Sequence, residues 1–176
     1  MATKKVTDTF ANMATIVCTE SAANTLTYKK LEVGFGTFEK VAWVIHKIEY
    51  FFFVNSTTFN STEDSVTCAL VTGNTRTSFH VPEVFTDPQV IDIANVARWD
   101  FGAAASGMVV VRPFSKDFSQ LPSGGLIIPP APLYGAIHSV GCAAANIAVL
   151  RIYYTIKELA VDEYWELVEA RRLLTA

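Results

Sequence analysis

The chain has 176 residues, of which 51% are hydrophobic and 18% are charged, and its mean hydropathy is +0.29. This length fits one domain, and the charged fraction lies below the quarter that is typical of soluble domains. The net charge of −3 argues against a strongly basic nucleic-acid-binding domain. No charge-free apolar run of about 20 residues predicts a membrane span. Because a chain of this size cannot bury all of its apolar side chains, we expect other subunits to cover part of its surface.

Residues 1–11 are expected to form a flexible N-terminal arm, and residues 12–22 a first strand. Residues 24–33 alternate imperfectly between apolar and polar, which is typical of a strand near an edge or an interface. Residues 40–54 are rich in aromatic and β-branched side chains and predict a long strand. Strict alternation gives this strand one face made of Val44, His46, Ile48, Tyr50 and Phe52. The opposite face then carries Ile45, Lys47, Glu49, Phe51 and Phe53.

The middle of the chain alternates between polar loops and short strands. Residues 55–65 have the composition of a polar loop, and residues 66–73 predict a short strand. Asp87 and Pro88 suit the cap and the first position of a short helix. Residues 107–114 then predict another strand.

Two further segments complete the predicted sheets. Residues 115–125 resemble a surface loop that leads into an interrupted strand at residues 121–139. Prolines cannot donate to a sheet ladder, so we expect this strand to lie at an edge or to cross a surface as an extended loop. The last strand, residues 146–159, is the clearest. Its continuous apolar face is made of Ala148, Leu150, Ile152, Tyr154 and Ile156.

These segments predict an all-β fold of about eight antiparallel strands, arranged as a sandwich or a barrel over residues 12–160. The long loops and the long terminal strands favour a single jelly roll. An immunoglobulin-like sandwich is less favoured because its Cys–Trp–Cys signature is absent.

Residues 161–176 predict an amphipathic C-terminal helix, with Asp162 as its N-cap. Acidic residues open the segment and Arg171 and Arg172 close it, an order that suits the helix dipole. Such a helix either covers its own barrel or docks on a neighbouring subunit. We favour docking, because Tyr, Trp and Arg dominate interface hot spots. The predicted interface residues are Tyr164, Trp165, Val168, Arg171 and Arg172.

Residues that carry chemistry are scattered. His46, His80 and His138 lie in separate segments, without the spacing of a metal site. Nucleophile-elbow, phosphate-loop and dinucleotide-binding motifs are absent from the sequence. We therefore predict no catalytic site, metal or cofactor, and disfavour an enzyme on a cupin-like barrel. The cysteines, which we expect to be buried thiols, are Cys18, Cys68 and Cys142. The acidic pair in the polar loop, which we expect to be solvated, is Glu63 and Asp64.

Three segments together resemble small single-jelly-roll icosahedral viral coat proteins, of the kind found in environmental viral genomes. They are "VIHKIEYFF", "GGLIIPPAPLYGAIHS" and "RIYYTIKELAVDEYWELVEARRLL". The resemblance spans residues 24–174. It implies a capsid protein that is made in the host cytoplasm and self-assembles in many copies into the shell of a virion. Coat proteins that package RNA often carry a basic N-terminal arm, which here is reduced to Lys4 and Lys5. Contact with a genome of either chemistry would then be weak and without sequence specificity.

An alternative function is an oligomeric β-sandwich module that binds a carbohydrate or a protein partner. Exposed aromatic side chains such as Trp99 or Tyr134 would form its binding platform. A small oligomer that binds glycans would distinguish this module from a shell-forming protein.

Overall fold

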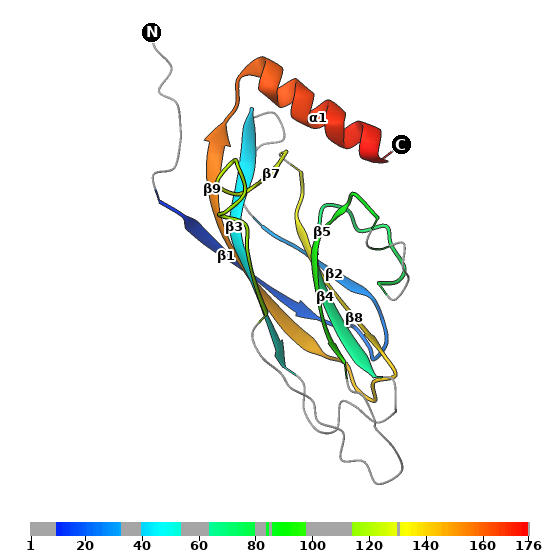
Figure 1. The fold of residues 1–176 in the computed structure, drawn as a ribbon. Coiled ribbons are helices and arrows are strands. Elements are labelled where there is room, and N and C mark those ends of the chain that lie inside the picture. The colour runs from blue at the N-terminus through cyan, green and yellow to red at the C-terminus, as the bar shows by residue number, and fades with distance from the viewer. Residues whose placement is uncertain are drawn as a thin grey trace.

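A computed structural model describes residues 10–32, 40–53, 64–79, 84, 86–97, 114–129 and 131–175, with side chains described as far as residue 169. These residues form two antiparallel sheets and a terminal helix (Figure 1). The first sheet consists of β1 (Asn12–Thr19), β3 (Val41–Phe53), β6 (Phe114–Asp117), β7 (Leu126–Ile128) and β9 (Ile147–Glu158). The second consists of β2 (Thr27–Lys30), β4 (Ser65–Val71), β5 (Val90–Ala97) and β8 (Tyr134–Val140). The helix is α1 (Val161–Thr175).

The strand order identifies the fold as a jelly roll. The first sheet runs β1-β9-β3-β6, with β7 pairing a further part of β3, and the second runs β2-β8-β4-β5. Strands from the two ends of the chain are therefore neighbours in each sheet, as expected when a long hairpin is rolled into two packed layers. The predicted all-β jelly roll is confirmed. The β6 segment extends into residues that were predicted to form a surface loop.

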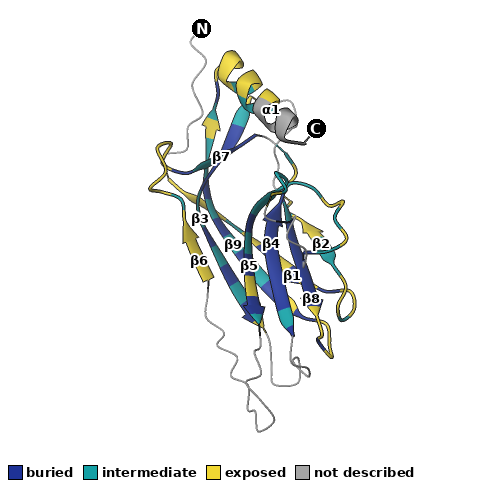
Figure 2. Ribbon diagram, turned by 45° about the vertical axis from the view of Figure 1, so that its right-hand side comes forward, coloured by how far each residue is buried: buried dark blue, intermediate teal, exposed yellow. Residues whose placement is uncertain are grey.

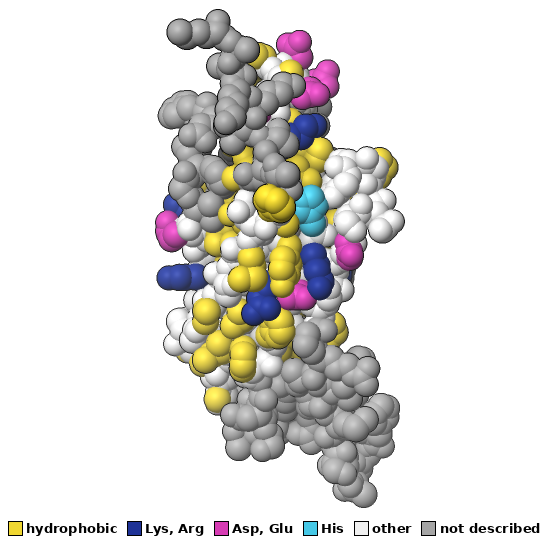
Figure 3. Space-filling view, turned by 90° about the vertical axis from the view of Figure 1, so that its left-hand side faces the viewer, with side chains coloured by type: hydrophobic (Ala, Val, Ile, Leu, Met, Phe, Trp, Pro, Cys, Tyr) yellow, Lys and Arg dark blue, Asp and Glu magenta, His cyan; other side chains and the backbone are white. Residues whose placement is uncertain are grey.

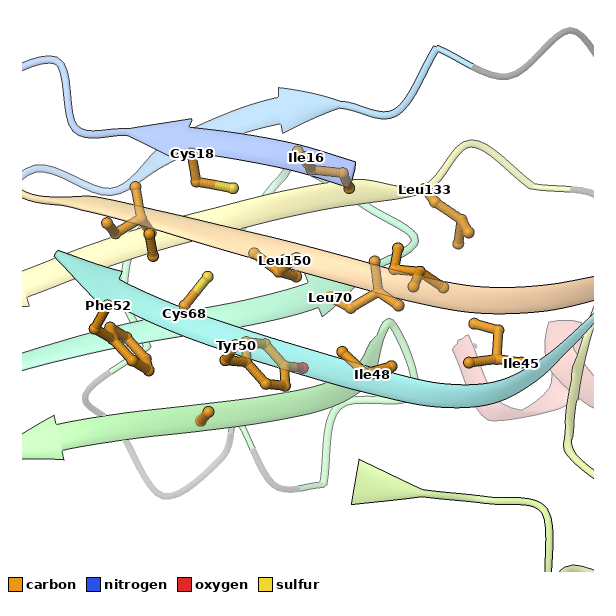
Figure 4. Packing of buried hydrophobic residues seen from close by; sticks show 14 of the residues in the cluster. Ile16, Cys18, Ile45, Ile48, Tyr50, Phe52, Cys68, Leu70, Leu133 and Leu150 are labelled. Carbon is orange, nitrogen blue, oxygen red and sulfur yellow. The ribbon is translucent and has the colours of Figure 1, made fainter. Parts of the chain in front are cut away.

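The core lies between the two sheets (Figure 4). Strand β9 supplies the apolar face that its alternation predicted, with Leu150 and Ile152 fully buried. Leu70 and Ile137 meet them from the opposite sheet and are also fully buried. Burying a side chain of this size contributes about 1.5–3 kcal/mol. The inward faces of the strands therefore supply the main stabilisation of the sandwich.

The long strand β3 contains a bulge that its alternating pattern did not predict. Ile45 pairs with Tyr154 and Lys47 with Tyr153, so His46 has no partner of its own on β9. A bulge adds one residue to one strand and shifts the alternation beyond it. The residues that share the inward face are therefore Trp43, Ile45, Ile48, Tyr50 and Phe52. The predicted grouping of Val44 and His46 with Ile48 was wrong.

The short helix predicted at Asp87 is also replaced by a turn and a strand. The side chain of Asp87 accepts a hydrogen bond from the Gln89 N–H at 2.8 Å, and its backbone carbonyl accepts one from Val90 at 3.0 Å. This local turn uses the acidic side chain as a helix cap would, but β5 then begins at once. The strand predicted at residues 107–114 lies outside the described residues, except for Phe114, which opens β6.

Helix α1 projects from one end of the sandwich rather than lying on either sheet (Figure 1). Its first turn is closed by a hydrogen bond from the Tyr164 N–H to the Ala160 carbonyl at 2.9 Å. The Glu163 carboxylate accepts the Ala160 N–H at 3.1 Å. Ala160 therefore occupies the N-cap position, and the prediction of Asp162 at this position was wrong. In a capping box, the side chain three residues after the N-cap accepts the backbone N–H of the N-cap residue, and Glu163 makes this contact with Ala160.

Candidate subunit interface

The first candidate surface is α1 itself. Among its described side chains none is buried, and none belongs to the hydrophobic core (Figure 2). Trp165 is 57% exposed, and its ring packs edge-on against Tyr164 with the ring centroids 5.6 Å apart. A large aromatic side chain left in water on a helix that covers no sheet is typical of a surface that binds another protein.

The predicted interface residues of α1 fall into two groups. Tyr164 and Val168 are half-buried, whereas Trp165 points to solvent. The side chains of Arg171 and Arg172 lie outside the described residues, as do the predicted genome-facing residues Lys4 and Lys5. The helix predicted at residues 161–176 is present over Val161–Thr175, while its role as an interface stays a prediction.

The second candidate surface is the outer face of the β1-β9-β3 sheet (Figure 3). The register places Val17 beside Val149 and Val149 beside Phe51. The next row of this face brings together Ile147 and Phe53, which are 40% and 62% exposed. The apolar patch is defined here as Val17, Phe51, Phe53, Ile147 and Val149. Its members come from three strands, so their gathering depends on long-range pairing.

A charged band borders the apolar patch on the same face. Glu49 binds Lys47 at 2.6 Å and accepts a hydrogen bond from the Tyr153 hydroxyl at 3.1 Å. The hydrogen bond from Lys47 lowers the pKa of Glu49. The Arg151 guanidinium lies farther away, 3.7 Å from Glu49, and stacks over the Phe51 ring at 5.2 Å. One carboxylate is therefore shared between two cations.

Arg151 retains unused hydrogen-bonding capacity. Its Nε is buried and has no partner within the described part of the chain, whereas its side chain is 39% exposed. Guanidinium groups recognise carboxylates through two parallel hydrogen bonds, and Glu49 does not approach Arg151 closely enough to supply them. Asp117 lies opposite Lys47 on the neighbouring strand β6 and adds a second carboxylate beside that lysine, so Arg151 is the cation whose pairing is incomplete.

The two described histidines lie in different sheets and do not form a site. Nδ1 of His46 lies 2.8 Å from the Gly124 carbonyl oxygen, and its Nε2 lies 2.9 Å from the Thr155 hydroxyl. His138 on β8 is buried, and its Nδ1 accepts a hydrogen bond from the Phe79 N–H at 3.3 Å. His80 lies outside the described residues. Among the residues that are described, no group of three His, Cys, Asp or Glu side chains has the geometry of a metal site.

The cysteines Cys18, Cys68 and Cys142 are buried free thiols, as predicted, and burial raises the pKa of Cys68. Asp64 is fully buried, so the prediction that it is solvated was wrong. Its predicted neighbour Glu63 lies outside the described residues.

The aromatic platform of the alternative binding module is not present at Tyr134. Its ring is half-buried and packs edge-on against Tyr28, with the ring centroids 6.5 Å apart. Trp99, the other expected member, lies outside the described residues. No helix in the described part of the chain is long and apolar enough to cross a membrane.

No protein-family model matches the sequence, and no curated protein was found to be similar to it. Solved structures similar to this chain were found, among them one from each of two viruses. A chain of tomato aspermy virus, solved by X-ray crystallography, overlaps 92% of this chain and 84% of its own length, with a TM-score of 0.37 and 10% identity. A chain of maize chlorotic mottle virus, solved by single-particle analysis, overlaps 84% of this chain and 94% of its own, with a TM-score of 0.30 and 13% identity. Both of these chains come from viruses, and the fold assignment itself rests on the strand order and register described above.

Proposed function

We propose that this chain is a viral coat protein, many copies of which assemble into a closed icosahedral shell around a genome. The jelly roll is one of the architectures that viral capsid domains use, although lectins and cupins share it. Fold alone therefore does not decide the function, and the surfaces of the subunit must carry the argument.

The observation that carries the proposal is the terminal helix. A helix that projects from the sandwich and exposes Trp165 gains little from its own subunit. The exposed apolar patch on the β1-β9-β3 sheet adds a second surface that one subunit leaves open. Two different unpartnered surfaces on one chain support head-to-tail contacts between copies, which close into rings or shells when the rotation allows.

The charge of the chain bears on how such a shell would hold its genome. With a net charge of −3 and only Lys4 and Lys5 near the N-terminus, each subunit would contribute little counterion release. Many weak contacts on one shell would still sum to useful binding. Any contact with nucleic acid would accordingly be weak in each subunit and independent of sequence.

Expression of the full chain and electron microscopy of the purified product test the proposal directly. The expected result is closed particles of uniform diameter, with a matching fast-sedimenting species in analytical ultracentrifugation. A monodisperse monomer at micromolar concentration would refute the coat-protein function. A small glycan-binding oligomer would instead support the alternative module.

A further inference from the structure

We propose that α1 of one copy docks on the outer face of the β1-β9-β3 sheet of a second copy. This inference rests on the proposed coat-protein function and names the two surfaces that meet. Trp165 would enter the apolar patch of Val17, Phe51, Phe53, Ile147 and Val149, and the acidic side chains beside it would face Arg151.

The exposed stripe of α1 has the composition that this face requires. Asp162, Trp165, Glu166 and Glu169 are all exposed, whereas Tyr164, Leu167 and Val168 are half-buried. Residues three and four positions apart share one side of a helix, so these four residues line a single stripe, which the exposed residues Val161 and Glu163 flank. One large aromatic side chain thus stands among three carboxylates.

The sheet face offers the complementary chemistry. The apolar patch lies one row from Arg151, because Val149 and Arg151 occupy the same face of β9 two residues apart. Lys47 and Arg151 share the single carboxylate of Glu49, and Nε of Arg151 has no partner among the described residues. The buried Nε lies out of reach, but a carboxylate from another chain would bind the exposed part of the Arg151 side chain, from which Glu49 lies 3.7 Å away.

The spacing on the two surfaces also agrees. Trp165 and Glu169 are separated by four helical residues, which is about 6 Å along the axis. Two residues along a strand, such as Val149 and Arg151, span about 7 Å. A helix laid along β9 therefore brings its tryptophan over the patch while Glu169 reaches the guanidinium.

The helix of the same chain does not cover this face. In Figure 1, α1 leaves the end of β9 and extends over the end of the sandwich, toward the side of the second sheet. Figure 3 looks directly at the outer face of the first sheet, where hydrophobic and basic side chains remain visible. In this proposal the helix that covers the face therefore comes from a second copy.

Charge reversal gives the first test, with closed particles counted by electron microscopy and sedimentation. Arg151→Glu and Glu169→Arg should each reduce the particle yield about tenfold, and the double variant should recover most of it, because opposite charges again meet. Lys157→Glu is the matched control, since this exposed lysine lies on the same face of β9, six residues away. Its particle yield should stay unchanged. Circular dichroism of each variant verifies that the subunit is folded.

Disulfide trapping gives a second test that needs no charge change. Chains with Phe53→Cys are mixed with chains with Trp165→Cys, assembled and mildly oxidised. We expect a covalent dimer on non-reducing gels that neither variant forms alone. Chains with Glu163→Cys in place of Trp165→Cys are the control, because Glu163 is exposed about 200° around the helix from Trp165. These chains should form no covalent dimer with the Phe53→Cys chains.

The outcomes separate this inference from the proposed function. Normal particles that neither cross-link nor respond to Arg151→Glu would overturn the docking and leave the coat-protein function standing. Intact particles that lose only bound nucleic acid in Arg151→Glu would assign the face to nucleic acid and also overturn the docking. Cross-linked small oligomers without any particles would support the docking while refuting the shell.

Discussion

The carboxylate of Glu20 accepts two hydrogen bonds from Ser139, one from its backbone N–H at 2.6 Å and one from its hydroxyl at 2.7 Å. Glu20 directly follows β1 in the first sheet, and Ser139 belongs to β8 in the second. The backbone and side-chain amides of Asn146 donate to the other carboxylate oxygen at 2.8 and 3.0 Å. One buried side chain therefore ties the two sheets together at one end of the sandwich.

Replacing Glu20→Gln should destabilise the subunit by about 2–3 kcal/mol, because an amide NH2 would face donors that need an acceptor. Urea unfolding followed by circular dichroism measures this loss. Glu32→Gln is the matched control on an exposed carboxylate, and we expect it to change stability by no more than about 0.5 kcal/mol. Equal effects of the two substitutions would show that the link from Glu20 to Ser139 does not stabilise the fold.

Tyr50→Phe should cost about 1–2 kcal/mol of subunit stability. The Tyr50 hydroxyl donates to Asp92 at 2.8 Å across the core, and both side chains are buried. Lys116 also pairs with Asp92, so the carboxylate would keep one partner. Tyr153→Phe is the control. It removes the hydroxyl that donates to Glu49, and because both of these side chains are only half-buried, it should reduce the stability of the subunit less. Equal losses in the two unfolding curves would argue against a special role of the buried bond.

Tyr50 should also make the stability of the subunit depend on pH above about pH 10. Burial, followed by the charge of Asp92, raises the pKa of Tyr50 well above its ordinary value of 10.0. A group whose pKa is higher in the folded state contributes stability that is complete below its unfolded pKa and is lost as the pH rises through its folded pKa. The stability difference between the wild type and Tyr50→Phe should therefore shrink above about pH 10. Unfolding curves at stepwise alkaline pH measure it, and a constant difference would contradict the assignment.

Gly135→Ala should destabilise the sandwich by about 1–3 kcal/mol through overpacking. A Cβ at this position would lie 2.5 Å from the sulfur of Cys18 and 2.9 Å from Cγ2 of Ile16. Removing the sulfur with Cys18→Ala makes room for that methyl group. The double variant should therefore be more stable than the sum of the two single losses predicts, as a double-mutant cycle in thermal unfolding can measure.

Trp165→Ala should weaken assembly far more than it weakens the fold. The side chain is 57% exposed and lies outside the core, so the free energy of unfolding of the subunit should change by no more than about 0.5 kcal/mol. Sedimentation measures the loss of particles, and thermal unfolding of the dissociated subunit measures the fold. Normal assembly together with much earlier melting would instead identify the helix as a cover of its own barrel.

The sequence predicted those elements whose local pattern is strong and whose environment is regular. Strand β9 alternates without interruption from Ala148 to Tyr154, and every second side chain is buried, as expected. The run from Tyr50 to Phe53 also divides between the two faces as predicted. In both segments, local alternation and burial between the sheets favour the same structure.

The predictions failed where a tertiary contact overrides the local pattern. Asp87 resembles a helix cap, but its carboxylate closes a turn that starts β5 and also pairs with Arg76. Asp64 resembles a loop residue, yet the fold buries it. The apolar patch combines residues of β1, β3 and β9, and the sequence shows these strands without showing which of them are neighbours.

The bulge at His46 has a consequence for how the length of this strand can vary between related sequences. Deleting His46 would leave Ile45, Lys47 and Ile48 in regular alternation, with both isoleucines still directed into the core. A one-residue deletion normally turns every following side chain of a strand to the opposite face. Here the loss would straighten the strand. It would remove the imidazole contacts with Gly124 and Thr155 and the hydrogen bond from the Phe118 N–H to the His46 carbonyl. We therefore expect this position to tolerate a single-residue deletion that the rest of β3 would not survive.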